Sequence, residues 1–207
     1  MDNVNIIDDA GPDAIAAWIA AHLENALAAS DGPVAFTMPG GSTPFPILKQ
    51  LVARPLEWSR ILVWPGDDRA VPEDHPASNT GKIRAAVEPA GGEVVTLTIM
   101  EQVPHFAFAW LGMGGDGHIA SLFPNTDPQV DEPAPIVRLT PDPLPPEAPF
   151  DRVTLTIPSL LASDAVLFTL GGSAEKRAVF EAAMRGENDL PVARLLRAAR
   201  QPVTCFA

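Results

Sequence analysis

The segment Ala-Phe-Ala-Trp-Leu-Gly-Met-Gly-Gly-Asp-Gly-His-Ile-Ala-Ser-Leu-Phe-Pro, residues 107–124, joins an apolar run to a turn rich in glycine. The apolar run over 106–111 predicts a short buried strand. Four glycines follow within residues 112–117, and glycine permits backbone conformations and close ligand approach that other residues prevent. We therefore expect a binding site at the end of this strand, with Asp116 and His118 as its polar groups. The alternative is a tight strand-to-helix turn with a capping aspartate, because glycine patterns also occur without a ligand.

The length and composition are those of an ordinary globular protein. The chain has 207 residues, of which 46% are hydrophobic and 19% are charged. Its net charge of −12, from 14 basic and 26 acidic residues, repels the phosphates of nucleic acids and anionic membranes. We therefore expect no nucleic acid and no membrane as partners. Any anion site must be built locally, from backbone N–H groups and a few placed cations.

Cys205 is the only cysteine, so no disulfide forms within the chain, and nothing in the sequence suggests an oxidising compartment. Its simplest role is that of a small buried apolar residue. The first residues lack the pattern of a signal peptide, and no stretch approaches the ~20 apolar residues of a membrane span. We expect a cytoplasmic protein that is a monomer or a weak homo-oligomer.

Strand-like and helix-like patterns alternate along the chain. The predicted strands are 4–7, 34–38, 61–64, 94–97, 106–111, 152–157, 165–170 and 203–206. The predicted helices are 12–29, 44–53, 79–87, 174–184 and 189–200, with helical turns over 158–162 and, at most, 119–123. This alternation is typical of an α/β fold with an open, mostly parallel, Rossmann-like sheet and helices on both faces, here as a single domain over 1–207. Nine prolines within 124–149 favour an irregular insertion with one edge strand over 136–139.

Glycine-containing turns follow four of the predicted strands, at 40–41, 66, 112–117 and 171–172. In open α/β sheets, ligands bind outside the carboxyl ends of the strands, so the shared position of these turns argues for a site more strongly than any one of them. The turn Gly40-Gly41-Ser42-Thr43 also precedes a helix, and its N–H groups and hydroxyls can hold an anion. The competing interpretation is an ordinary helix cap by Ser42 or Thr43.

Two cations follow other turns. Arg69, after Asp67 and Asp68, offers planar donors suited to phosphate or carboxylate, although a local salt bridge with those aspartates is the competing interpretation. Lys176 lies in the first turn of a predicted helix, where a cation opposes the helix dipole unless an anion is bound between them. The alternative for this lysine is a solvated side chain that points outward.

His118 is the candidate general base, because imidazole titrates near neutral pH. Asp116 can orient the ring or stabilise its charged form, although a spacing of two residues does not ensure contact. We assign no chemistry to His22, His75 or His105, and no spacing indicates a metal site. Because the chain also lacks a serine elbow, we expect a water activated by His118 to be the nucleophile.

Five motifs together resemble the 6-phosphogluconolactonase family, within the wider group of sugar-phosphate isomerase-like α/β proteins. They are Gly40-Gly41-Ser42-Thr43-Pro44, residues 66–72 with Ser78-Asn79 after them, residues 111–124, Arg152-Val153-Thr154-Leu155-Thr156, and residues 171–176. The motifs occur in the family's order and span about residues 34–180. The family hydrolyses 6-phospho-D-glucono-1,5-lactone to 6-phosphogluconate in the oxidative pentose phosphate pathway, and the resemblance implies no metal and no cofactor.

The resemblance also implies roles for individual residues. His118 would activate water for attack on the lactone carbonyl, with Asp116 beside it and Arg69 in contact with the substrate. The residues implied around the substrate and its phosphate are Gly40, Gly41, Ser42, Thr43, Asp67, Gly114 and Lys176. The developing oxyanion needs donors, which are either backbone N–H groups of the turn over 114–117 or Arg69.

Three features depart from the family pattern. Asp68 stands where the family usually has glutamate, which we expect to be tolerated if the residue is structural. The segment 97–106 is short, and the excursion over 124–149 is unusually rich in proline. Neither length change touches a motif, but both can reshape the mouth of the site.

Two other functions compete with lactone hydrolysis. Amino-sugar-phosphate deaminases and isomerases share the fold and a similar turn, but Phe-Asn-Glu-Pro typically follows that turn and its glutamate serves catalysis. Here Ala-Ser-Leu-Phe-Pro, residues 120–124, contains no carboxylate. A non-catalytic sugar-phosphate-binding protein is the third possibility, and the presence of both Asp116 and His118 argues against it.

Overall fold

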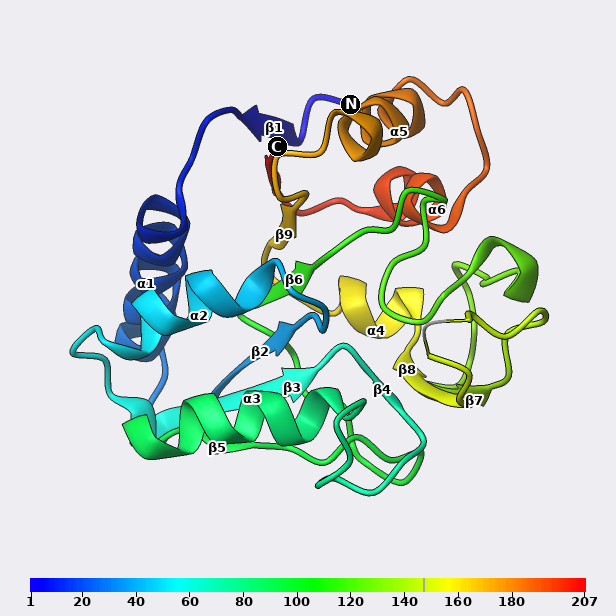
Figure 1. Ribbon diagram of the computed structural model, residues 1–207. Helices are drawn as coiled ribbons and strands as arrows, with labels where there is room; N and C mark the ends of the chain where they lie inside the picture. Colours follow the sequence, from blue (N-terminus) through cyan, green and yellow to red (C-terminus); the bar gives the residue numbers. More distant parts are fainter. Residues whose placement is uncertain (147) are drawn as a thin grey trace.

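Seven parallel strands form the central sheet of the computed structural model, which describes residues 1–146 and 148–207 (Figure 1). Their order is β1-β10-β9-β6-β2-β3-β5. The bounds are β1 Val4–Ile7, β2 Val34–Met38, β3 Ile61–Pro65, β5 Glu93–Val94, β6 Phe108–Leu111, β9 Val166–Thr169 and β10 Val203–Phe206. The parallel sheet with helices on both faces confirms the predicted fold class.

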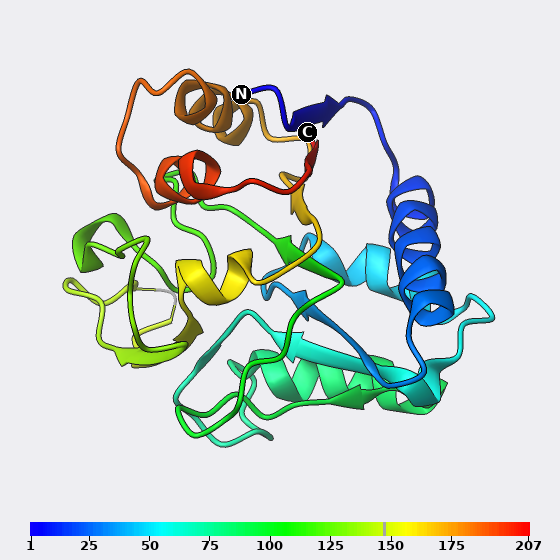
Figure 2. The same cartoon turned by 180° about the vertical axis from the view of Figure 1, so that it is seen from behind.

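Three helices cover each face of this sheet. One face carries α1 (Pro12–Ala29), α2 (Pro44–Val52) and α3 (Asn79–Val87), and the other carries α4 (Ile157–Leu161), α5 (Ala174–Met184) and α6 (Pro191–Ala198). Short 3-10 turns lie at Trp58–Arg60, Glu88–Ala90 and Pro124–Thr126. Both chain termini lie near α5 (Figures 1 and 2). Within the described ranges, no helix combines the length and the apolar character needed to cross a bilayer.

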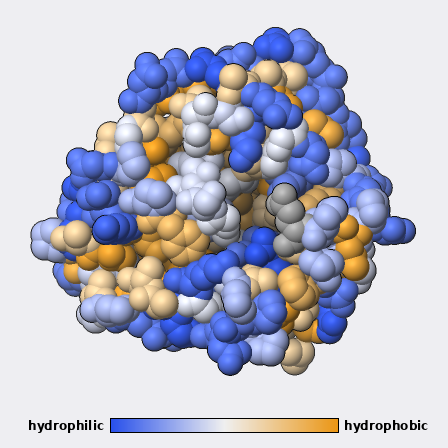
Figure 3. Space-filling view, in the orientation of Figure 1, coloured by the Kyte–Doolittle hydropathy of each residue, from blue (hydrophilic) through white to orange (hydrophobic). Residues whose placement is uncertain are grey.

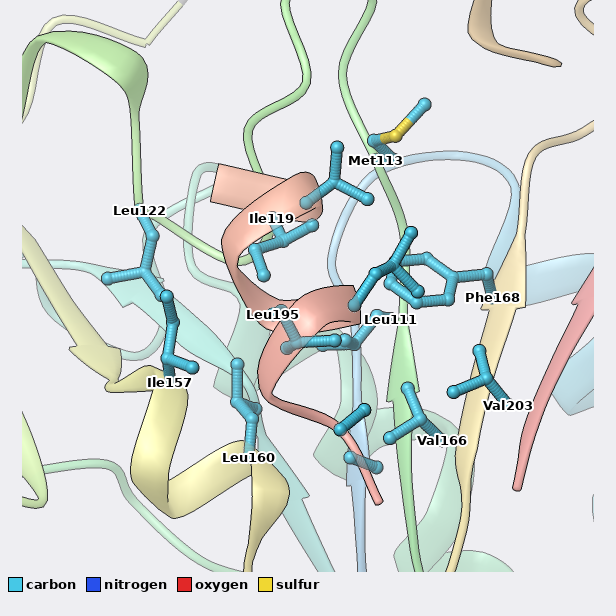
Figure 4. Close-up of a cluster of buried hydrophobic side chains, with 14 of the residues drawn as sticks. Leu111, Met113, Ile119, Leu122, Ile157, Leu160, Val166, Phe168, Leu195 and Val203 are labelled. Carbon is cyan, nitrogen blue, oxygen red and sulfur yellow. The ribbon is translucent and has the colours of Figure 1, made fainter. Parts of the chain in front are cut away.

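Alternating side chains of the strands supply a hydrophobic core on each face. Phe36 and Phe108 point to the α1–α3 face, where their rings stack with centroids 5.0 Å apart. On the opposite face, Leu195 of α6 lies among Leu111 of β6 and Leu160 of α4 (Figure 4). The sheet is therefore buried on both sides, as a parallel sheet requires.

The order in which successive strands are added to the sheet reverses between β2 and β6, although the two strands are parallel. From β2 the chain continues through β3 to β5 on one side, whereas from β6 it continues through β9 to β10 on the other. Loops that leave two adjacent strands in opposite directions open a crevice at the carboxyl end of the sheet. The two glycine-rich turns over 40–43 and 112–118 leave these two strands, so the topology places them side by side.

A second, three-stranded antiparallel sheet borders that crevice. It contains β4 (Asp67–Arg69), β8 (Arg152–Leu155) and β7 (Ile136–Leu139), in the order β4-β8-β7. The predicted edge strand over 136–139 is present. Residues 67–69 differ from the prediction, because they form a strand rather than a turn: Asp67 and Arg69 pair with Thr154 and Arg152. No local pattern announces this pairing, because the partners are more than 80 residues apart.

Other boundaries also differ from the predictions. The expected helical turn over 119–123 is wrong: Ile119 forms isolated bridges to Met113 and Leu122, and Ala120 has a left-handed φ of 49°. The expected strands over 94–97 and 106–111 are shorter, because β5 ends at Val94 and β6 begins at Phe108. The extent of the single domain over 1–207 stays a prediction.

Candidate active site

The four glycine-containing turns converge at the carboxyl edge of the sheet. A Cβ added to Gly40 would lie 2.3 Å from Oδ1 of Asn79, so only glycine lets this turn pack against the start of α3. An added Cβ at Gly171 would lie 3.0 Å from Oγ1 of Thr43, which brings two further turns into contact. The structure therefore brings these turns together as predicted, and their close packing depends on the absence of a Cβ at the two glycines.

Two adjoining cavities open between the turns. The smaller, about 380 Å³, is the glycine lobe, lined among others by Gly40, Gly41, Thr43, Gly114 and Lys176. The larger, about 620 Å³, is the arginine lobe, lined among others by His75, Lys82, Phe150 and Arg152. Both lobes share Asp67, Arg69, His118 and Ala120. The face drawn in Figure 3 is hollowed near its middle, where pale residues of near-neutral hydropathy meet strongly hydrophilic ones.

His118 lies where the two lobes meet, and Asp116 holds its ring. Nδ1 of His118 is 2.6 Å from Oδ1 of Asp116, and the same oxygen accepts from the His118 backbone N–H at 3.2 Å. The hydrogen bond to His118 holds the pKa of the Asp116 carboxyl below its ordinary value. An ionised carboxylate can only accept, so Nδ1 donates to it, and in a neutral ring this arrangement leaves the lone pair on Nε2. A spacing of two residues did not by itself predict this contact between His118 and Asp116, and the structure contains it.

Backbone contacts hold the turn that carries His118. Gly117 has a left-handed φ of 78°, and a Cβ there would lie 2.7 Å from Cδ1 of Leu190. The Gly117 carbonyl accepts from the N–H of Val192 at 3.1 Å, which ties the turn to the start of α6. The ring of His118 also packs on Phe123, with centroids 4.8 Å apart. These contacts position the imidazole at the cleft, where its side chain remains 34% exposed.

Asp67 is a buried carboxyl group at the junction of the lobes, only 7% exposed. Its Oδ2 accepts a hydrogen bond of 2.5 Å from Ser121, and the amide of Asn79 lies 3.4 Å from Oδ1. Burial raises the pKa of Asp67 above its ordinary value, and the Ser121 hydrogen bond opposes that shift. Asp67 thus faces the cleft as a carboxyl that retains its proton to higher pH than an exposed aspartate.

Asp68 points the other way and caps α3. Its carboxylate accepts from the N–H groups of Asn79 at 2.6 Å and Thr80 at 2.9 Å, and from the Ser78 hydroxyl at 3.1 Å. Ser78 in turn accepts from the N–H of Gly81 at 3.0 Å, as the predicted helix cap requires. Asp68 is therefore structural, and the shorter side chain is tolerated because it reaches these donors directly.

Few cations of the chain lie free of carboxylates, and most of those that do line the cleft. Eight of the 14 Lys and Arg residues form ion pairs. Within residues 1–146 and 148–207, the six that form none are Lys49, Arg69, Lys82, Arg152, Lys176 and Arg200. Four of these six line the two lobes. The competing interpretation of Arg69 is wrong, since its guanidinium donates to the carbonyl of Ala77 and not to its neighbouring aspartates.

The structure brings eight of the ten predicted site residues to the walls of the cleft: Gly40, Gly41, Thr43, Asp67, Arg69, Gly114, His118 and Lys176. Asp116 stands behind His118, and exposed Ser42 lines neither lobe. The predicted alternative of a helix cap is also wrong, because Thr43 makes no side-chain capping bond. Pro44 and Pro46 carry no N–H, so the first turn of α2 offers fewer donors here than an ordinary helix start, and the turn before it supplies the rest.

Sequence reasoning missed Lys82 and Arg152. Arg152 belongs to a quoted motif but received no role, and Lys82 belongs to none. Arg152 reaches the cleft only because β8 pairs with β4 across the Pro-rich excursion.

Cys205 is buried, as predicted, and this burial raises the pKa of its thiol to about 12. No cluster of three or more His, Cys, Asp or Glu that could hold a metal occurs in the part of the chain that the structure describes.

Comparisons with known proteins agree with this geometry. The family model of glucosamine-6-phosphate isomerases/6-phosphogluconolactonase matches residues 8–90 and 88–204. A 6-phosphogluconolactonase of Pseudomonas aeruginosa is 35% identical over 208 residues, covering 89% of this chain and 86% of its own. A crystal structure of a 6-phosphogluconolactonase from Shewanella baltica superposes with a TM-score of 0.82 at 25% identity, over 98% of this chain and 97% of that one. The enzyme of Thermotoga maritima shares the fold, with a TM-score of 0.81 at 24% identity over the same shares. The chain is therefore a member of the glucosamine-6-phosphate isomerase/6-phosphogluconolactonase family.

Proposed function

We propose that the protein hydrolyses 6-phospho-D-glucono-1,5-lactone to 6-phosphogluconate by attack of a water molecule that His118 activates. The observation that carries the proposal is the 2.6 Å contact between His118 and Asp116 at the junction of two cation-lined lobes. The predicted cytoplasmic location, with no nucleic acid or membrane as partner and a monomer or weak homo-oligomer as the state, is part of this proposal.

The phosphate of the substrate binds in the glycine lobe. Backbone N–H groups of the turn over 40–43, the Thr43 hydroxyl and the ammonium group of Lys176 surround this lobe. Lys176 lies in the first turn of α5, where its charge opposes the helix dipole, and a bound phosphate removes that conflict. This placement leaves the lactone ring over His118.

His118 transfers a proton twice in this reaction, first accepting it from water and then donating it to the ring oxygen that leaves C1. Nε2 of His118 takes a proton from water as the water oxygen bonds to C1, and a tetrahedral intermediate forms. The intermediate collapses as the bond between C1 and the ring oxygen breaks, and the imidazolium returns the proton to that oxygen at C5. Asp116 keeps the ring oriented and stabilises its positive charge during the transfer, because its carboxylate bonds Nδ1.

Arg69 is the better candidate for the oxyanion donor. Within the glycine-rich turn, the N–H of Gly114 is bonded to the His118 carbonyl at 3.0 Å and the N–H of Gly117 to the Gly114 carbonyl at 3.0 Å. Two of the backbone donors that the sequence left as an alternative are thus already used. Arg69 lines both lobes, and within the described residues its guanidinium donates a single hydrogen bond, to the Ala77 carbonyl at 2.8 Å. Its remaining terminal N–H groups are free for the charge that develops on the lactone carbonyl.

Deamination or isomerisation of an amino-sugar phosphate is the competing activity in the same family. The residues after His118 disfavour it, because Ser121 and Phe123 are occupied in bonding Asp67 and packing on the imidazole, and residues 119–124 carry no carboxylate. A lactone offers an electrophilic carbonyl to a single base, which is what the cleft provides.

The test uses lactone generated immediately before the assay, because lactones open spontaneously. Loss of the lactone is followed with and without protein, and glucosamine 6-phosphate is supplied in parallel with detection of released ammonia. We expect a rate well above that of buffer with the lactone and no ammonia from the amino sugar. A lactone rate equal to that of buffer would overturn the proposal, and ammonia release would favour the competing activity.

A further inference from the structure

The arginine lobe holds more positive charge than a sugar lactone with one phosphate requires. Arg69, Lys82 and Arg152 all line it, and none of them forms an ion pair with a described carboxylate. The phosphate is already provided for in the glycine lobe by Lys176 and the turn over 40–43. The net charge of the chain is −12, so three cations in one cavity without an acidic partner among the described residues are an exception, which points to a ligand.

Arg152 is the clearest sign of a built site. The residue is only 2% exposed, and its guanidinium donates to the carbonyls of Ala148, at 2.8 Å, and Phe150. These carbonyls orient the group but do not neutralise it. Asp67, Asp151 and Asp68 partly offset this charge, but none of them forms an ion pair with Arg152. Burying a charge without a paired opposite charge is costly, so the arrangement is most stable when an anion completes it.

Arg69 adds to the excess of positive charge in the arginine lobe, because it lies directly opposite Arg152 in the β4–β8 register. Like charges at directly opposite positions of antiparallel strands destabilise the pair. Burial and the charge of Arg69 lower the pKa of Arg152 accordingly. Nε of Arg69 is buried without a hydrogen-bond partner in the described structure. Among the described residues, the one carboxyl that lines the lobe is that of Asp67, whose pKa is raised by burial and which is bonded to Ser121.

We propose that Arg69, Lys82 and Arg152 form a second anion site, which receives the carboxylate of the ring-opened sugar acid. The inference rests on the proposed function, because hydrolysis creates a carboxylic acid at C1, beside His118 and Arg69, and this acid releases its proton to solvent to become the carboxylate. The lactone carries one anionic group, and the acid carries one at each end. Guanidinium groups bind carboxylates through two parallel N–H···O bonds, so two facing arginines suit a carboxylate that forms between them.

The site distinguishes product from substrate. Its charge draws the reaction toward the open acid as the ring bond breaks, and the same charge retains the acid afterwards, so the product competes with the lactone for the cleft. A ligand that keeps the phosphate but carries an alcohol at C1 lacks the second contact and binds more weakly.

Binding is measured by titration calorimetry with two ligands of nearly equal size, 6-phosphogluconate and glucitol 6-phosphate. In the second ligand the C1 carboxylate is replaced by an uncharged CH2OH group. We expect the wild-type protein to bind 6-phosphogluconate about ten-fold or more tightly than glucitol 6-phosphate, the scale of one charge-assisted hydrogen bond. Gluconate and inorganic phosphate are titrated as well, to separate occupation of this lobe by a carboxylate from occupation by free phosphate.

Lys82→Gln removes a charge from the exposed rim of the lobe without disturbing the buried arginine. It is expected to reduce the preference for 6-phosphogluconate about three-fold, because exposed ion pairs are weak. Lys49→Gln, the same change on α2 away from the cleft, should leave both affinities unaltered. Arg152→Gln should remove most of the preference, and retained affinity for glucitol 6-phosphate shows that this variant has folded.

Equal affinity of the wild-type protein for the two ligands would overturn the inference. So would an unchanged preference in a folded Arg152→Gln protein. Lactone hydrolysis is measured separately on the wild-type protein. Hydrolysis without ligand preference would refute the second anion site alone, whereas ligand preference without hydrolysis would refute the proposed function and leave the anion site standing.

Discussion

Replacing Gly114 by alanine should abolish activity while leaving the fold intact. A Cβ at this position would lie 2.2 Å from Nδ1 of His118 and 2.6 Å from Oδ1 of Asp116. Neither distance is possible, so the methyl group must occupy the place where the imidazole and the carboxylate now meet. The φ of Gly114 lies outside the left-handed region, so the backbone conformation there is not one that requires glycine for a positive φ.

The expected effects of Gly114→Ala on stability and on activity differ greatly in size. His118 and Asp116 side chains are 34% and 53% exposed, so they can swing into solvent, and losing such a pair costs ~0.2–1 kcal/mol. The lower chain entropy of alanine in the unfolded state offsets this by ~0.4–1 kcal/mol. The free energy of unfolding should therefore change by less than ~1 kcal/mol. Displacing a general base lowers the rate by ~100-fold to 10,000-fold, equivalent to about 3–5 kcal/mol in the activation barrier.

Urea unfolding and hydrolysis of fresh lactone are measured on the same preparation. Gly11→Ala is the matched control, because Gly11 has a φ of −75° and an added Cβ there meets no atom within 4 Å. Gly11 is the N-cap of α1, where alanine is less favourable than glycine, so the control should retain activity and lose only a little stability. If Gly114→Ala keeps wild-type activity, the contact between His118 and Asp116 is not needed for hydrolysis. A loss of several kcal/mol of stability would instead show that the turn cannot release these side chains.

Three further substitutions test other parts of the cleft. The stability of Asp67→Asn relative to wild type should increase as pH rises from the ordinary pKa of aspartate through the raised pKa of Asp67, because the folded wild-type carboxyl keeps its proton in this range and the unfolded one has lost it. Urea titrations at several pH values measure this difference in unfolding free energy, and a difference independent of pH would contradict it. Asp68→Ala should cost ~2–4 kcal/mol of unfolding free energy by stranding the N–H groups of Asn79 and Thr80, with a smaller cost for Asp68→Glu, and equal stability in urea would refute its capping role. Lys176→Gln should raise KM for the lactone about ten-fold or more with little change in kcat, and an unchanged KM in steady-state assays would remove the phosphate from the glycine lobe.

Most of the fold was predictable because its signals are local. Helix α1 begins at the predicted Pro12 and buries Ile15, Ile19 and Leu23 at the spacing of one helical face. The apolar run before the glycine-rich turn is a buried strand, as expected of a parallel sheet. By contrast, β4 was missed because its hydrogen bonds go to β8, and the three polar residues Asp67–Arg69 carry no strand pattern.

The site residues show the same difference between local signals, which were predictable, and long-range contacts, which were not. Gly40, Gly114, His118 and Lys176 follow strands, and the topology of an α/β sheet brings such positions together. Arg152 was given no role because its approach to Arg69 depends on strand pairing between distant segments. The contact between Asp116 and His118 depends on the side-chain conformations of a four-glycine turn, which residue spacing leaves undetermined.

The role of His118 as the general base is tested most directly by comparing lactone loss with wild-type protein, His118→Ala protein and buffer at the same pH. We expect the wild-type rate to exceed that of buffer, and the variant rate to fall by about two orders of magnitude or more, with its unfolding curve close to that of wild type. A folded His118→Ala protein that hydrolyses the lactone as fast as wild type would contradict the proposed mechanism.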